Sequence, residues 1–326
     1  MSQIINKKVL VTGGAGFIGS NIIDKLLVQN NQVVCLDNFS TGKRENIAHH
    51  LSNPSFQLIE GDIRDLETCN EATSGIDIVL HQAALGSVPR SINDPITSNE
   101  VNVSGFLNIL VAARTSGVKR IVYAASSSTY GDNTEMPKIE ERIGKPLSPY
   151  AVTKYVNELY ATVFSHVYDM ELIGLRYFNV FGPRQDPNGA YAAVIPLFVK
   201  ALMQKQSPKI NGDGSFSRDF TYVANVVQAN ERAATTENPL AINTVYNVAC
   251  GSRVTLNELV GSIKELLMKY DEEVAQVTPE YGPVRAGDVP HSLASIEKGQ
   301  QLLGYKPSHQ FHDGLKEAIG WYWKNM

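Results

Sequence analysis

The stretch VLVTGGAGFIGS, residues 9–20, decides the fold expected of this chain. Val9–Thr12 is a short apolar run, and glycines follow at positions 13, 16 and 19 as a helical segment begins. Such a turn lets backbone N–H groups and the positive helix end approach a pyrophosphate without obstruction by Cβ atoms. The spacing is GxxGxxG rather than the commoner GxGxxG, and a merely tight turn is the alternative. We expect a dinucleotide-binding turn formed by Gly13, Gly16 and Gly19.

Short β-branched runs recur between longer helical segments over the first 180 residues. The expected strands are Val9–Thr12, Val33–Asp37, Phe56–Gly61, Ile76–His81, Arg120–Ala125 and Leu172–Phe178. Segments such as Phe17–Gln29 and Thr97–Ala113 are long enough to be right-handed crossover helices. This alternation predicts a doubly wound parallel sheet of the Rossmann type, an α/β fold with helices on both faces.

The pattern changes after residue 180, where FGPRQDPNGAY (181–191) and INGDGSFSRDF (210–220) are rich in turn residues. Two helices are expected later, over Thr255–Tyr270 with a capping box of Thr255 and Glu258, and from about 312 to 324. We therefore expect a dinucleotide-binding domain over 1–180 and a smaller α/β lobe over 181–326. One strand between 217 and 250 is expected to return to the sheet.

Composition excludes several classes of partner. The 326 residues carry a net charge of −4, without the basic excess that nucleic acid binding requires. No apolar run reaches the ~18 residues of a membrane span, and no signal segment is recognisable. The three cysteines are far apart, which favours buried thiols in a reducing cytoplasm over disulfides or structural zinc. His49 and His50 are adjacent but match no metal motif, so no metal is expected, and His81 is interpreted as a packing residue.

Two acidic residues follow expected strands. Asp37 ends the second strand, 18 residues after Gly19, where a carboxylate can accept both hydroxyls of an adenosine ribose. It would repel a 2′-phosphate, which favours NAD over NADP, although Lys43 and Arg44 are close in sequence. Asp62 ends the third strand and is expected either to contact adenine or to cap a turn.

A Tyr-x3-Lys pair gives the catalytic hypothesis. Tyr150 and Lys154 in SPYAVTKY begin a helix shortly after the fifth strand, which ends in the hydroxyl-rich AASSSTYG (124–131). At positions i and i+4 the two side chains share one helix face. An ammonium and a positive nicotinamide ring would together lower the pKa of the phenol and prepare it for proton transfer. A surface helix pair is the alternative reading.

These motifs together resemble the extended short-chain dehydrogenase/reductase family over essentially the whole chain. Within it, seven segments are similar to UDP-hexose 4-epimerases, most of all to the subgroup that prefers UDP-N-acetylglucosamine and UDP-N-acetylgalactosamine. The segments are DNFSTG (37–42), GDIRD (61–65), HQAALGSVPRS (81–91), SPYAVTK (148–154), RYFNVFGPRQDPNGAYAAVIP (176–196), SRDFTYV (217–223) and RAGDVPHS (285–292).

The resemblance implies NAD as cofactor and reversible epimerisation at C4 through a 4-keto sugar, without net redox change. Tyr150 would transfer the O4 proton, Ser126 would hydrogen-bond O4, and Lys154 would hold the nicotinamide ribose. The implied cofactor-binding residues are Gly13, Gly16, Phe17, Ile18, Gly19, Asp37, Asn38, Ser40, Thr41, Gly42, Asp62, Ile63, Ala83, Tyr150, Lys154 and Phe178. The implied substrate-binding residues are Gly86, Ser87, Ser126, Ser128, Asn179, Gln185, Ala193, Val194, Lys209, Asn211, Arg218, Arg285, Asp288 and Ser292.

Substrate choice and assembly also follow from the resemblance. Epimerases restricted to UDP-glucose and UDP-galactose carry Tyr at the place of Ser292 and Lys at that of Gly86, so room for a 2-acetamido group is expected here. A UDP-uronate or UDP-N-acetylhexosaminuronate 4-epimerase stays open, as does a dehydratase or decarboxylase, although Ser127 and Ser128 replace the Asp-Glu pair of dehydratases. A non-catalytic NAD-sensing scaffold is the alternative outside enzymes. A homodimer through helices at about 97–113 and 150–167 is expected.

Overall fold

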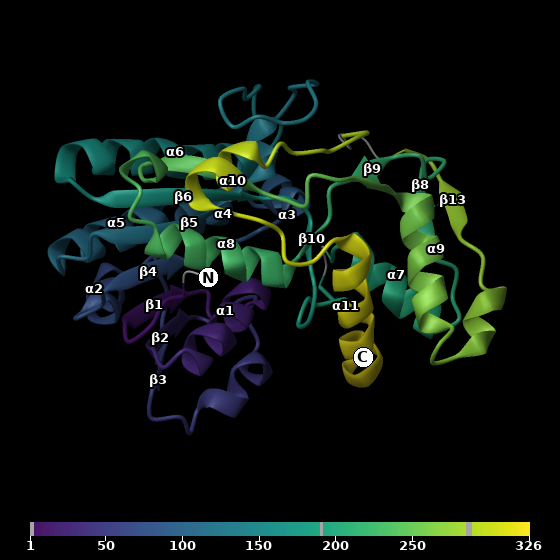
Figure 1. Ribbon diagram of the computed structural model, residues 1–326, viewed down its shortest axis with the longest axis horizontal. Coiled ribbons are helices and arrows are strands. Elements are labelled where there is room, and N and C mark those ends of the chain that lie inside the picture. Colours follow the sequence, from purple (N-terminus) through teal and green to yellow (C-terminus); the bar gives the residue numbers. More distant parts are fainter. Residues whose placement is uncertain (1–2, 190–191, 285–288) are drawn as a thin grey trace.

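A computed structural model describes residues 3–189, 192–284 and 289–326. Its centre is a sheet of seven strands in the order β11-β6-β5-β4-β1-β2-β3, and all neighbouring strands run parallel (Figure 1). This confirms the doubly wound α/β fold. The bounds are β1 Lys8–Thr12, β2 Gln32–Asp37, β3 Phe56–Glu60, β4 Ile78–His81, β5 Arg120–Ser126, β6 Glu171–Tyr177 and β11 Thr244–Val248.

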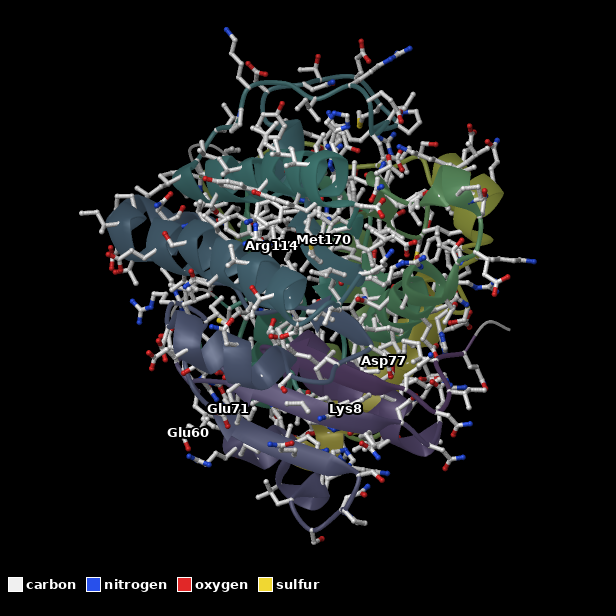
Figure 2. All side chains as sticks on the ribbon, turned by 90° about the vertical axis from the view of Figure 1, so that its left-hand side faces the viewer. Lys8, Glu60, Glu71, Asp77, Arg114 and Met170 are labelled. Carbon is white, nitrogen blue, oxygen red and sulfur yellow. The ribbon has the colours of Figure 1, made fainter. Side chains whose placement is uncertain are left out.

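Helices cover both faces of the sheet, and alternate residues of each strand point to opposite faces, so both sets of side chains are buried. In β1, Val9 and Val11 pack with α1 and α8, whereas Leu10 packs with α5. Figure 2 shows the amino-terminal edge, where Lys8 and Asp77 lie side by side and the Lys8 backbone N–H donates to the Asp77 carboxylate (2.8 Å). The helices around the sheet are α1 Phe17–Val28, α2 Leu66–Thr73, α3 Val88–Asn93, α4 Pro95–Asn99, α5 Phe106–Thr115, α6 Pro149–Tyr168, α8 Val223–Thr235 and α10 Glu297–Leu303.

The expected helical segment over 97–113 is present, but it is not one regular α-helix. A π-helical turn, Glu100–Gly105, separates α4 from α5. The amide of Asn102 lies in this turn and bonds both backbone groups of Leu85, at 2.8 and 3.2 Å, and its backbone carbonyl accepts from Asn157 of α6 (2.7 Å). A wider turn changes the direction of side chains relative to a regular helix. Here it ties the loop after β4 to α6.

A second hydrophobic core lies beside the carboxyl ends of the strands, to the right in Figure 1. Phe181, Phe220 and Phe311 meet in this core at ring distances of 5.8–6.5 Å. The capping box at Thr255 and Glu258 is confirmed, and the helix that it begins ends earlier than expected, at Leu267. The elements of this lobe are β7 Val180–Phe181, α7 Val194–Met203, β8 Lys209–Asn211, β9 Ser217–Arg218, β10 Thr221–Tyr222, β12 Val254–Thr255, α9 Leu256–Leu267, β13 Glu280–Gly282 and α11 Phe311–Asn325.

Short 3-10 helices complete the described elements. They are η1 Arg44–Asn46, η2 Ala48–His50, η4 Ser127–Tyr130, η5 Pro239–Ala241 and η6 Glu272–Gln276. The three cysteines are free and buried, as expected. Among the described residues, no helix is both long and apolar enough to cross a membrane.

Candidate functional site

The glycine turn after β1 packs directly against the loop that follows β4. Gly13 has a φ of +65°, and a Cβ there would lie 2.7 Å from the backbone N and Cα of Ala83. A Cβ on Gly19 would lie 2.2 Å from the carbonyl oxygen of Gly13. Both positions therefore require glycine, and the first turn of α1 approaches the sheet edge closely. The exposed backbone N–H groups of such a helix start attract a phosphate.

A cleft of about 270 Å³ opens over this turn, at the carboxyl ends of β1 to β4. Most of the predicted cofactor residues line it: Gly13, Gly16, Phe17, Ile18, Gly19, Asp37, Asn38, Ser40, Thr41, Asp62, Ile63 and Ala83. Gly42 lies just behind, where a Cβ would be 2.9 Å from both carboxylate oxygens of Asp37. In a doubly wound fold, this edge of the sheet is where nucleotides bind.

The two acidic residues of this cleft differ in environment. Asp37 is 7% exposed and accepts from the backbone N–H groups of Ala15 (2.9 Å) and Phe39 (2.8 Å). Burial raises its pKa, and these two hydrogen bonds oppose the rise. A carboxylate has further lone pairs for ribose hydroxyls. Asp62 is bonded by Arg64 and Asn38, which lowers its pKa to about 2. It also accepts from the Arg64 backbone N–H (2.8 Å), so it caps a turn while lining the cleft.

Tyr150 and Lys154 share one face of α6, next to the end of β5. Ser148 caps this helix by accepting from the Ala151 N–H (3.1 Å), and the Tyr150 N–H donates to Ser91 (2.9 Å). The Tyr150 side chain lies near Ser126, the last residue of β5, whose hydroxyl acts to lower the pKa of the phenol. Ser126 also accepts from the hydroxyl of Ser128 (2.9 Å). The tyrosine and the two serines therefore form one hydroxyl cluster.

The ionisation of the pair differs in part from expectation. Burial raises the pKa of Tyr150, and the nearby Ser126 hydroxyl only opposes this rise. Lys154 is 3% exposed, donates to the Ala124 carbonyl (2.9 Å), and has its pKa lowered to about 8 by burial. In the protein alone, the burial that raises the pKa of Tyr150 therefore outweighs the lowering of that pKa that we expected from the Lys154 ammonium.

His81 lies buried between the hydroxyl of Thr12 (2.8 Å) and the ring of Phe106. Burial, together with the nearby Lys154, lowers the pKa of His81 to about 3. The imidazole is therefore neutral at physiological pH. This environment agrees with the interpretation of His81 as a packing residue.

A second cavity, of about 520 Å³, lies beside the hydroxyl cluster. It is lined by the predicted substrate residues Ser126, Ser128, Asn179, Arg218 and Ser292, and by Phe178, which was predicted for the cofactor. Asn179 has a φ of +36° and donates to the Asp219 carbonyl (2.9 Å). Arg218 donates to the carbonyls of Ser217 and Pro290, at 3.0 Å each. The side chains that line this cavity thus include hydroxyl groups and a guanidinium.

Other predicted substrate residues lie outside this cavity. Gly86 lines the cofactor cleft, and Ser87 caps α3 through the Arg90 N–H. Gln185 donates to the Val180 carbonyl (2.9 Å) and lines a third cavity. The remaining ones belong to the second lobe, where Ala193 precedes α7, Val194 begins it, and Lys209 and Asn211 lie in β8. Arg285 and Asp288 lie outside the described residues.

Sequence reasoning missed the apolar wall of the second cavity. Val88, Pro89 and Ile92 of α3 contribute to it, with Leu147 and Val289 from distant segments. Ile92 is 61% exposed and Leu147 60%. The sequence feature that could have predicted this wall is VPRSI (88–92), an apolar segment that follows the loop after the fourth strand.

Comparisons with known proteins agree with this geometry. Residues 9–249 match the profile of the NAD dependent epimerase/dehydratase family. The chain is 39% identical to a solved UDP-N-acetylglucosamine 4-epimerase from Methanobrevibacter ruminantium M1 in complex with UDP-N-acetylmuramic acid (TM-score 0.90, 99% of this chain and 100% of that one). It is 35% identical to UDP-glucose 4-epimerase of Mycolicibacterium smegmatis (97% of this chain, 98% of the relative). It is 32% identical to UDP-glucuronate 4-epimerase 2 of Arabidopsis thaliana (96% of this chain, 75% of the relative).

Proposed function

The chain belongs to the NAD dependent epimerase/dehydratase family, among its NAD-dependent UDP-sugar 4-epimerases, and on this premise we propose that it interconverts UDP-N-acetylglucosamine and UDP-N-acetylgalactosamine. The observation that carries the proposal is the proximity of Tyr150 to Ser126, whose side chain lines a cavity of about 520 Å³ together with Asn179 and Arg218. The test is incubation with UDP-N-acetylglucosamine without added cofactor, followed by separation of the C4 epimers. A Tyr150→Phe variant serves as the inactive reference.

The residues of the cleft fit NAD. Its glycine turn leaves no space for a Cβ at Gly13, and the Asp37 carboxylate can receive a ribose diol but would repel a 2′-phosphate. The proposed cofactor contacts are the cleft residues given above, with Gly42, Tyr150, Lys154 and Phe178. When bound, NAD supplies the acceptor and donor of the hydride at C4.

Tyr150 moves the proton in this mechanism. Its phenolate takes the proton of the 4-hydroxyl when the C4 hydrogen leaves as hydride, and returns it when the ketone is reduced on the other face. Ser126 holds the same oxygen by a hydrogen bond. Lys154 is proposed to hold the nicotinamide ribose. Its positive charge, together with that of the nicotinamide ring, would lower the pKa of Tyr150 and so oppose the rise that burial causes.

The sugar must rotate between the two transfers, so the nucleotide must be held more firmly than the hexose. We assign the pyrophosphate to Asn179 and Arg218, whose planar guanidinium suits phosphate oxygens. Arg285 and Asp288 are proposed for the same nucleotide from their motif. Ala193, Val194, Lys209 and Asn211 are proposed to surround the uridine. The hexose then faces the apolar wall of Val88, Ile92 and Leu147, which offers it few polar contacts.

The preference for N-acetylated sugars rests on two small residues. Ser292 lines the substrate cavity. Gly86 lines the cofactor cleft, and a Cβ there would meet no atom within 4 Å. We propose that these two small residues leave room for the 2-acetamido group while the hexose rotates. Ser87, Ser128 and Gln185 are proposed amide or hydroxyl contacts. The preference is tested by kcat/KM for the four UDP-sugars, and higher values for UDP-glucose and UDP-galactose would overturn it.

A uronate 4-epimerase is a second candidate, because Lys138 lines the same cavity and could pair with a sugar carboxylate. Assays with UDP-glucuronate and UDP-N-acetylglucosaminuronate distinguish it. A dehydratase or decarboxylase has less support, because Ser127 and Ser128 offer no carboxyl group for water elimination. A non-catalytic NAD-sensing scaffold would hold NAD and form no epimer.

We also propose a homodimer. Val152, Leu159, Val163 and Val167 form an exposed apolar stripe along α6, each 48–59% exposed. Residues at this spacing share one helix face and match a helix of a second copy. Sedimentation should give twice the chain mass of 35.8 kDa, and Leu159→Glu should give the monomer. The three buried free thiols support the proposed cytoplasmic location.

A further inference from the structure

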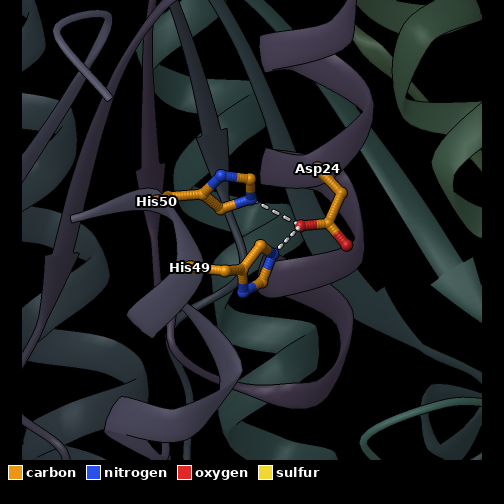
Figure 3. Close-up of side chains that lie close together, drawn as sticks. All are labelled: Asp24, His49 and His50. Atoms are coloured by element: carbon orange, nitrogen blue, oxygen red, sulfur yellow. Dashed lines mark hydrogen bonds and ion pairs between the residues drawn. The ribbon is translucent and has the colours of Figure 1, made fainter. Parts of the chain in front are cut away.

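Asp24, His49 and His50 converge on one point of the surface of the sheet domain (Figure 3). Asp24 lies in α1, and the two histidines end the 3-10 helix η2. The Nε2 atoms of His49 and His50 lie 3.1 and 2.6 Å from the same oxygen, Oδ1 of Asp24. All three ligand atoms lie within 4.8 Å of one another.

The local backbone does not explain this convergence. Successive residues of a 3-10 helix are rotated by about 120°, so adjacent side chains diverge unless something gathers them. Here the two imidazole rings lie 3.9 Å apart and both turn toward Asp24. His50 is held by packing against Phe56, with ring centroids 5.8 Å apart. Its side chain is 14% exposed, whereas that of His49 is 55% exposed and can admit a ligand from solvent.

The carboxylate is already supported from behind. Arg184 pairs with the other oxygen, Oδ2, and donates to the Asn46 carbonyl (3.2 Å). Burial alone would raise the pKa of Asp24, but the bonds from Arg184, His50 and His49 outweigh it and hold the pKa below its usual range. With Oδ2 paired to Arg184, Oδ1 is the oxygen directed at the two imidazoles. Carboxylate ligands of metals commonly have their second oxygen held in this way.

We propose that Asp24, His49 and His50 form a binding site for one divalent first-row transition ion, of which Zn²⁺ is the type. Two imidazoles and one carboxylate are a ligand set that Zn²⁺, Co²⁺ and Ni²⁺ accept. Tetrahedral ligands about 2.1 Å from an ion lie about 3.4 Å apart, so each Nε2–Oδ1 gap needs to widen by less than ~1 Å. In the hydrogen-bonded form each Nε2 must carry the proton, because the carboxylate can only accept. Binding moves that proton to Nδ1 and needs no oxidant.

The fourth position of such an ion would face open space. His49 lines the third cavity, of about 700 Å³, together with Lys43, Asn46 and Arg184. Water completes the coordination there. Because η2 follows the loop that carries Ser40 and Thr41, the ion would fasten this loop to α1 at the adenosine end of the cofactor cleft.

Co²⁺ titration of chelator-treated protein tests the site directly. We expect one ion per chain, visible d–d absorption of a four- or five-coordinate Co²⁺, and displacement of that absorption by Zn²⁺. His49→Gln and His50→Gln should each weaken binding at least ~10-fold, and Asp24→Asn as much. His312→Gln, an exposed histidine of α11, is the matched control and should bind as wild type does.

Folding is measured separately, by the Tm of each variant in chelator. His49 is exposed, so His49→Gln should keep the Tm of wild type and give the cleanest comparison. Zn²⁺ at a hundredfold excess over its Kd should raise the Tm of wild type by about 4 °C, and that of the double histidine variant not at all. Absence of stoichiometric binding at 100 µM Co²⁺, or equal binding by wild type and the double variant, would overturn the proposal.

Discussion

The cofactor cleft and the substrate cavity are built differently. The cleft consists of turns that follow consecutive strands, and its critical contacts are made by backbone, as at Gly13 and Ala83. The cavity is assembled from side chains of distant segments, from Val88 to Ser292. A rigid backbone cradle suits a cofactor that stays in place, whereas a wall of side chains suits a sugar that must turn over. Substitutions in the cleft should therefore reduce NAD binding and the free energy of unfolding. Substitutions in the cavity should instead change the catalytic rate and the selectivity between sugars.

The largest effect is expected where the two regions meet. Tyr150→Phe removes the group that transfers the proton but keeps the ring, so kcat should fall by about 10³-fold. NAD content and Tm should stay close to those of wild type. Separation of epimers after timed incubation measures the rate.

Tyr155→Phe on the same helix is the control and should keep kcat within about twofold of wild type. Equal activity of the Tyr150→Phe enzyme and wild type would contradict the role of this phenol.

A backbone substitution tests the cleft. Gly13→Ala places a Cβ 2.7 Å from the Ala83 backbone at a φ of +65°, so the protein should lose NAD and about 2–4 kcal/mol of unfolding free energy. Urea unfolding and the NAD content of purified protein are the measurements. Gly117→Ala has a similar φ, +73°, and open space around it, so only about 1 kcal/mol should be lost, with NAD retained. Equal losses in the two variants would show that the close approach is unimportant.

A side-chain substitution tests the cavity. Ser292→Tyr should reduce kcat/KM for N-acetylhexosamine substrates at least ~10-fold more than for UDP-glucose and UDP-galactose, because the larger ring occupies the space for the acetamido group. NAD content should not change. A uniform reduction for all four sugars would argue against a steric basis of selectivity.

The smallest effect concerns Lys154 and pH. Burial lowers its pKa to about 8 from an ordinary 10.5, so between these values the unfolded chain binds more protons than the folded one. The free energy of unfolding of wild type therefore increases as pH rises through this window. The Lys154→Met variant has no group at this position that titrates, so it lacks this increase. The free energy of unfolding of wild type relative to the variant should rise by ~1–2 kcal/mol from pH 7.5 to 10.

Urea unfolding at both pH values, with matched NAD content, measures this difference. A difference that does not change with pH would mean that Lys154 is not desolvated.

The sequence predicted the first region better than the second for a physical reason. The strand, glycine turn and helix at residues 9–20 are determined locally, and parallel strands bring Gly13, Asp37, Asp62 and Ala83 to one edge without further information. The apolar wall of the cavity depends on how α3, Leu147 and Val289 fold together, which periodicity does not encode. The π-helical turn at Glu100–Gly105 depends on the bonds of Asn102 with Leu85, which are tertiary contacts. Likewise, Asp24 is 25 residues from His49, and no local pattern joins them.

Epimerisation in D₂O with no added cofactor tests most directly whether Tyr150 and a resident NAD act together at C4. A hydride transferred to NAD and returned does not exchange with solvent, whereas a C4 hydrogen removed as a proton does. We predict that wild type converts UDP-N-acetylglucosamine to its C4 epimer with protium retained at C4, and that Tyr150→Phe forms almost none. Deuterium at C4 of the product, or no product from NAD-containing wild type, would contradict this mechanism.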